Sequence, residues 1–220
     1  MRTKKRIIFL FLCLQAVITA SGAEGKKHDA GLWVNFSVTP KPIAQRGFIT
    51  YSLEYRSKED FSKTSLWCGA INAYYSLNSW LKVGAGYEHF LNKDADGKYT
   101  PEYRYYPAVL FSFQKGLFAG SFRSYVMNTF AKWNDPHWEL RNKMKVSYQL
   151  KNTRLKTFVA MEPYYIIYPV DDDRFKKNRY IAGFSYSFGR HTIDSFYLRE
   201  VFHHKPLVNN IIAIEYYISF

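Results

Sequence analysis

The sequence predicts an all-β protein that closes into a transmembrane, antiparallel, up-and-down β-barrel of about ten strands. Three observations support this class. Apolar and polar residues alternate along many segments, 19% of the 220 residues are aromatic, and the mean hydropathy is nevertheless negative, at -0.32. A barrel with aromatic girdles outside and polar residues inside combines these properties. A helical membrane protein would not combine them. In addition, no run of the mature chain approaches eighteen consecutive apolar residues, so the sequence offers no transmembrane helix.

Residues 1–23 have the pattern of a cleaved secretory signal peptide. Four basic residues lie within the first six, an apolar run covers residues 7–17, and small residues occupy positions 19–23. Such a run is too short to cross a membrane as a helix, whereas its order of charge, apolar core and small residues is that of a signal peptide. We therefore expect an exported protein whose remaining cysteine, Cys68, packs as a small apolar residue in a strand.

The net charge of +13 includes this leader. Without its four basic residues, the mature chain keeps 27 of the 31 basic residues against 18 acidic ones, a net charge of +9. Proteins that bind nucleic acid gather basic residues on one patch or helix. Here the basic residues alternate with apolar ones along the expected strands, so we do not expect a nucleic-acid partner.

The alternation is clearest over residues 138–150. Trp138, Leu140 and Val146 fall on one face of an extended chain, and Arg141 and Lys143 fall on the other. Thirteen residues is about twice the usual strand length in globular proteins and suits a tilted strand that crosses a bilayer. The other expected strands are identified by the same alternation of apolar and polar residues.

Similar segments follow one another along the whole chain. There are eleven of them, at residues 31–38, 47–57, 65–76, 79–90, 101–114, 117–129, 138–150, 156–168, 178–188, 190–202 and 209–220. Prolines 40 and 42 end the first, and Pro163 inside the eighth indicates a bulge or an edge near the rim. Tight turns are expected at residues 77–78, 115–116, 152–155 and 189, with longer connections between them.

The number of strands follows from parity. Single-chain bacterial barrels have an even number of strands, short periplasmic turns and longer outer loops. Counting back from a periplasmic C-terminus makes residues 47–57 the first of ten strands, and twelve strands is the alternative. The expected organisation is a signal peptide at 1–23, a periplasmic or lumenal segment at 24–46 that contains Trp33, and the barrel at 47–220.

The last segment carries an outer-membrane assembly signal. Alternate residues form an apolar outer row that ends on a terminal phenylalanine: Ile214, Tyr216, Ile218 and Phe220. This arrangement resembles the signal by which bacterial outer-membrane barrels reach their assembly machinery. We accordingly expect a location in the outer membrane of a Gram-negative cell. The expected partners are membrane lipid, the barrel-assembly machinery and periplasmic chaperones, with a monomer favoured over an oligomer.

Ionisable residues of both signs gather on the inward row and are expected to line the lumen. They are Glu54, Arg56, Lys82, Glu88, Glu102, Arg104, Arg123, Glu139, Arg141, Lys143, Lys145, Glu162, Arg179 and Glu215. Side chains about fill an eight-stranded barrel, while open porins need about sixteen strands. Ten strands favour a narrow or plugged lumen with a bracing Arg/Glu network, and a narrow polar pore or ligand cavity is the alternative.

No reaction is expected from the sequence. A hydrolase or acyltransferase needs a nucleophile, a base and an orienting group within hydrogen-bond reach, and none of the six histidines stands in such a pattern. Residues 92–100 and the three aspartates at 171–173 read as solvated loops instead of metal sites, so no metal or cofactor is expected. The expected role is passive transport or envelope integrity. A lipid-modifying barrel enzyme and a soluble periplasmic ligand-binding β-protein remain alternatives.

The chain resembles a family of uncharacterised outer-membrane β-barrels, known only as a domain of unknown function and typical of Bacteroidetes-type Gram-negative bacteria. The resemblance covers essentially the whole mature chain. It rests on motifs in a fixed order, namely Trp33, residues 54–56, 84–87, 102–104 and 139–141, the Glu162–Pro163 pair, residues 178–179 before Gly183, and the aromatic C-terminus. It implies a fold and a location, and it supplies no ligand or catalytic residue.

Overall fold

The computed structural model of the chain describes residues 27–43, 46–94, 96–131, 134–169 and 174–220. The expected signal peptide and the three aspartates at 171–173 lie outside these ranges. Every regular element in them is a β-strand, and no helix there is long and apolar enough to cross a membrane.

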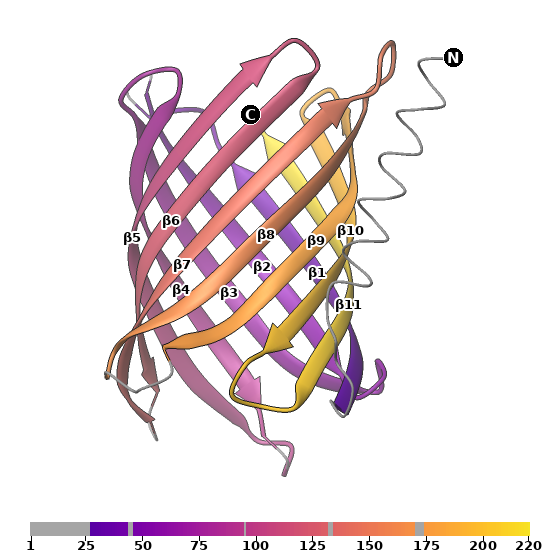
Figure 1. The fold of residues 1–220 in the computed structure, drawn as a ribbon. Coiled ribbons are helices and arrows are strands. Elements are labelled where there is room, and N and C mark those ends of the chain that lie inside the picture. Colours follow the sequence, from indigo (N-terminus) through magenta and orange to yellow (C-terminus); the bar gives the residue numbers. More distant parts are fainter. Residues whose placement is uncertain (1–26, 44–45, 95, 132–133, 170–173) are drawn as a thin grey trace.

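Eleven strands form a closed up-and-down barrel (Figure 1). In chain order they are β1 (Lys27–Thr39), β2 (Gly47–Lys58), β3 (Lys63–Ser76), β4 (Leu81–Lys93), β5 (Tyr99–Lys115), β6 (Phe118–Ala131), β7 (Asn134–Gln149), β8 (Leu155–Tyr168), β9 (Phe175–Phe188), β10 (His191–Phe202) and β11 (Leu207–Ser219). Each strand from β1 to β10 pairs antiparallel with its successor. The all-β barrel is therefore confirmed.

The prediction of ten strands was wrong, because residues 31–38 belong to the wall instead of preceding it. β1 pairs antiparallel with β2 on one side and parallel with β11 on the other, with Gly31 opposite Ile211 and Ser37 opposite Tyr217. In an up-and-down barrel, antiparallel pairing of the first and last strands requires an even number of strands. Here the first and last strands pair in parallel, which requires an odd number, so all eleven alternating segments join the barrel.

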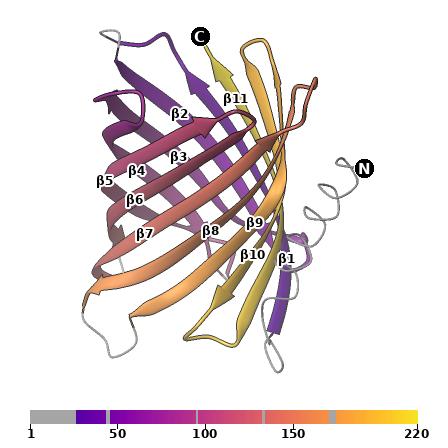
Figure 2. The same cartoon turned by 45° about the horizontal axis from the view of Figure 1, so that its top comes forward.

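The connections gather at the two ends of the barrel (Figure 2). At the end that holds the C-terminus, hereafter the C-terminal end, tight turns join β3 to β4, β5 to β6, β7 to β8 and β9 to β10. Gly116 and Gly189 take positive φ angles of 60° and 59° there, which glycine adopts without strain. In the β3–β4 turn, the Asn78 Oδ1 atom accepts hydrogen bonds from the backbone N–H groups of Trp80 and Leu81.

The two faces of the wall differ as the alternation predicts. Large apolar side chains such as Leu53, Phe113 and Val146 stay exposed on the outer face, with 53%, 64% and 52% of their surface accessible. Polar and charged side chains point inward. A pairing irregularity between β8 and β9 falls between Tyr164 and Tyr165, close to Pro163, where a bulge was predicted.

Candidate functional site

The barrel interior holds two adjoining cavities of about 340 and 280 Å³. Every residue expected to line the lumen borders one or both, except Glu102. That carboxylate lies beside the larger cavity, where its Oε1 atom is 2.5 Å from Arg104 Nη2. Of these two cavities, Lys82 and Lys145 border the smaller but not the larger, and Arg123, Lys143 and Glu215 border both.

Two aromatic rings and three arginine side chains stack on one another along the larger cavity. We call this set the cation–aromatic belt: Trp33, Arg56, Phe90, Arg104 and Arg179. The Trp33 ring lies between Arg56 of β2 and Arg179 of β9, whose guanidinium carbons are 3.9 and 4.8 Å from the ring centroid. The Phe90 ring is 4.2 Å from Arg104 and 5.9 Å from Arg56. Because β2 and β9 are not neighbours in the wall, Trp33 links strands across the lumen.

Ion pairs join the neighbouring strands β7 to β10 from inside. Arg141 Nε lies 2.8 Å from Glu162 Oε1, and Arg179 lies 3.4 Å from the other oxygen of Glu162. Arg179 and Lys177 both pair with Glu200, at 2.7 and 2.9 Å. The Glu162 side chain is only 1% exposed, so this ladder satisfies charges that would be costly to bury alone.

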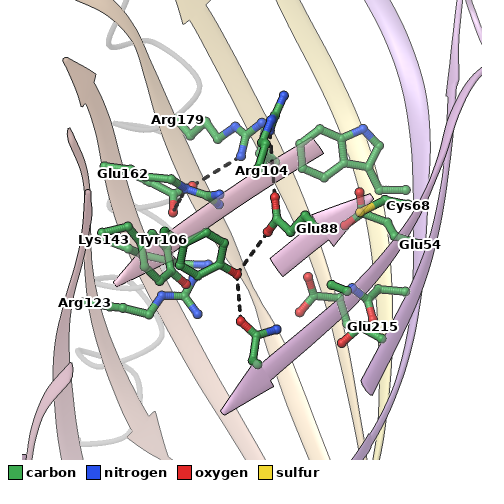
Figure 3. A pocket seen from close by; sticks show the side chains of 18 of the residues that line it. Glu54, Cys68, Glu88, Arg104, Tyr106, Arg123, Lys143, Glu162, Arg179 and Glu215 are labelled. Carbon is green, nitrogen blue, oxygen red and sulfur yellow. Dashed lines mark hydrogen bonds and ion pairs between the residues drawn. The ribbon is translucent and has the colours of Figure 1, made fainter. Parts of the chain in front are cut away.

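Tyr106 bridges the wall between β5 and β3. Its hydroxyl donates to Asn72 Oδ1 at 2.7 Å and lies 3.2 Å from Glu88 Oε1 (Figure 3). The ring fits against β4 because position 86 is glycine, where a Cβ atom would lie 2.3 Å from Tyr106 Cζ. Glycine at this inward position therefore makes room for one aromatic ring.

The smaller cavity lies toward the C-terminal end and has a mixed lining. Lys145 of β7 reaches Asp194 of β10 at 3.5 Å and stacks over the Phe158 ring at 3.8 Å. Lys82 lies over the Phe48 ring at 4.7 Å. Phe196 adds a further apolar surface, so this chamber offers both charged and apolar groups to a solute.

Four charges of the predicted lumenal set have no ion-pair partner in the described part of the chain: Lys82, Arg123, Lys143 and Glu215. Lys82 lies over the Phe48 ring, and the other three border both cavities. Arg123 Nε is also buried without a hydrogen-bond partner. In Figure 3, Arg123 and Lys143 lie on one side of the cavity and Glu215 on the facing side.

Several lumenal residues were not anticipated. Lys176 and Lys177 were assigned to a loop, but β9 begins at Phe175 and both side chains border the larger cavity, where Lys176 pairs with Glu139. Asp194 and Glu200 lie on the inward row of β10, and the alternation of that segment could have revealed them. Tyr106 could have been found likewise, since it has the parity of Arg104.

The residues of the expected assembly signal lie on the outer row of β11 and just beyond it. Ile214 and Phe220 are 43% and 53% exposed, and Tyr216 stacks against Phe36 of β1 with ring centroids 5.7 Å apart. Over the ranges that the structure describes, no cluster of three or more His, Cys, Asp or Glu side chains could hold a metal ion. The arrangement offers charge recognition and hydrogen bonding within a polar lumen.

Residues 30–209 match the sequence model of a family described as Protein of unknown function (DUF2490). No curated protein and no solved structure matches the chain.

Proposed function

We propose that this chain, which belongs to the DUF2490 family of proteins of unknown function, is an outer-membrane β-barrel that admits small polar solutes. The observation that carries this proposal is the pair of adjoining polar cavities, which share Arg123, Lys143 and Glu215 along the barrel interior. Two such chambers in sequence offer a solute a continuous series of polar contacts.

The outer face supports a membrane location. Soluble monomers rarely expose large apolar patches, whereas here exposed apolar side chains recur on all sides of the wall. Near the C-terminal end, exposed aromatic residues include Trp80, Phe118 and Tyr186, and near the opposite end they include Tyr103 and Tyr168. Two aromatic bands that flank an apolar surface are typical of outer-membrane barrels.

Closure supports the same location. A bilayer offers no water to unpaired backbone groups, so spanning strands must form a barrel without edges. The parallel β1–β11 pairing leaves no strand edge in this wall. The outer row of β11, with Ile214 and Phe220 exposed, is available to the assembly machinery that handles such barrels.

The size of the lumen sets the class of solute. Eleven strands lie between the eight of a filled barrel and the sixteen of an open porin. The cation–aromatic belt and the ion pairs between β7 and β10 narrow the interior further and brace the wall. Small hydrophilic molecules therefore suit the lumen, and oligosaccharides do not.

Extraction and liposome swelling test the proposal. The protein should resist extraction by salt alone, show heat-modifiable migration on gels, and speed the entry of glycerol into liposomes while excluding a trisaccharide.

Trp33→Ala should admit larger sugars because it removes the ring between Arg56 and Arg179. Trp67→Ala, an outward tryptophan that is 40% exposed, is the matched control and should behave like the wild type. Release by salt, or swelling no faster than that of empty liposomes, would overturn the proposal.

A further inference from the structure

The lumen separates opposite charges between two walls. Arg123 of β6 and Lys143 of β7 are directly opposite each other in the strand register, so two like charges sit side by side. On β10 and β11, Asp194 and Glu215 are likewise directly opposite each other. Like charges in this position destabilise a sheet, so each pair needs compensation from elsewhere.

The protein only partly provides that compensation. Glu162, on the strand next to Lys143, is already shared by Arg141 and Arg179. On the facing wall, one oxygen of Asp194 lies 3.5 Å from Lys145 of β7, while the other oxygen is buried without a hydrogen-bond partner. Glu215 accepts a hydrogen bond from the Tyr217 hydroxyl but has no cation partner among the described residues.

The two pairs face each other across one chamber. All four side chains border the smaller cavity of about 280 Å³. Around the barrel, β8 and β9 separate the wall of β6 and β7 from the wall of β10 and β11 on one side, and β1 to β5 separate them on the other. Figure 3 shows the same separation for Arg123, Lys143 and Glu215.

From this charge separation we infer that the smaller chamber binds small zwitterions, molecules that carry a carboxylate and an ammonium group, such as α-amino acids. The inference rests on the proposed function and names its solute class. The carboxylate pairs with Arg123 and Lys143, and the ammonium group pairs with Glu215 and Asp194. A simple cation would be repelled by the basic wall, and Lys82 and Lys145 add further positive charge to the chamber. A simple anion would pair with the basic wall but leave the Glu215 carboxylate without a cation. Phe158 and Phe196 offer an apolar surface to the side chain of the solute.

Isomeric solutes test this inference. L-Alanine and lactamide have the same atoms, but only alanine is a zwitterion, and neither has a net charge that would complicate liposome swelling. The wild-type barrel should admit alanine about tenfold faster, the ratio that one hydrogen bond to a charged group supplies. Arg123→Gln, Lys143→Met and Glu215→Gln should each remove most of this preference while lactamide entry is kept, which also shows that the variants fold.

Glu54→Gln is the matched control. Glu54 is a lumenal carboxylate that pairs with Arg56 and borders only the larger cavity, so its replacement should leave the preference for alanine unchanged. A barrel that admits both isomers at equal rates would overturn the inference and leave the proposed function standing. Faster alanine entry in Glu215→Gln would also overturn it, because that result identifies a site for anions.

Calorimetric titration of the folded barrel in detergent separates binding from passage. Wild type should bind alanine and not lactamide, and Lys143→Met should bind alanine about tenfold more weakly. Alanine binding without any liposome swelling would overturn the proposed pore and uphold the site. Failure of wild type to bind alanine, together with equal swelling rates for the two isomers, would overturn the site alone.

Discussion

At the scale of the residue, Gly86 shows how closely the lumen is packed. It faces inward on β4, and the Tyr106 ring occupies the space that a side chain at position 86 would need, with three ring or hydroxyl atoms within 2.5 Å of an added Cβ atom. The same ring carries the hydroxyl that bonds to Asn72. A methyl group at position 86 must therefore displace the tyrosine and its hydrogen bond together.

We expect Gly86→Ala to lower the free energy of unfolding by about 1–3 kcal/mol, the usual effect of overpacking. Urea unfolding of the barrel in lipid, followed by tryptophan fluorescence, measures it. Gly69→Ala on β3 is the control, because no atom lies within 4 Å of its added Cβ, and it should change stability by less than about 0.5 kcal/mol. Equal effects of the two substitutions would mean that Tyr106 does not pack on Gly86.

At the scale of the element, β6 and β7 allow the proposed lipid contact to be tested by depth. Val126 lies near the middle of β6, is 37% exposed, and is opposite Leu140 of β7. Val146 is also exposed but lies three residues before the end of β7. In a bilayer, the energy of an outward charge depends on its distance from the interface.

Val126→Arg should therefore destabilise the barrel by about 2–4 kcal/mol, and Val146→Arg by about 0–1 kcal/mol. The difference arises because arginine at the midplane cannot extend its charged group into water, while arginine near the turn can. Unfolding in lipid vesicles gives both values. If the two variants unfold like wild type, the outer face does not contact lipid at these positions.

The strands could be predicted from the sequence because the side-chain alternation that defines them is local. The segment expected at residues 138–150 is β7 over Asn134–Gln149, and its inward residues Arg141, Lys143 and Lys145 border the cavities. The partner of β1 could not be predicted in this way. Parallel pairing with β11 joins residues that are about 180 positions apart in the chain, and alternation within a segment carries no information about its partner.

At the scale of the whole molecule, the sequence predicted many of the charges that lie inside, although not Lys176, Lys177, Asp194 or Glu200, and it did not predict which of them pair. Arg141 pairs with Glu162 of the next strand, whereas Lys145 pairs with Asp194 across two intervening strands. Such pairing depends on the register and on the curvature of the closed wall. The unpaired charges of Arg123, Lys143 and Glu215, which carry the proposed zwitterion site, therefore became visible only in three dimensions.

Parallel closure also predicts the orientation of the chain ends. β1 and β11 run in the same direction, so Lys27 lies at the end opposite to the C-terminus, near the β10–β11 connection, where its N–H donates to the Pro206 carbonyl at 2.7 Å. In the proposed membrane orientation, the C-terminal end faces the periplasm. The beginning of the barrel then lies at the cell surface, whereas an even-stranded barrel would place it in the periplasm.

An epitope inserted directly before Lys27 should therefore bind antibody on intact cells, as should one inserted in the β10–β11 connection at residues 203–206. An epitope in the β9–β10 turn at Gly189 should bind only after the outer membrane is permeabilised, and it serves as the control for membrane integrity. If the epitope before Lys27 is shielded while that at 203–206 is accessible, β1 does not close the wall beside β11. The protein in the cell would then be the ten-stranded barrel that parity alone predicts.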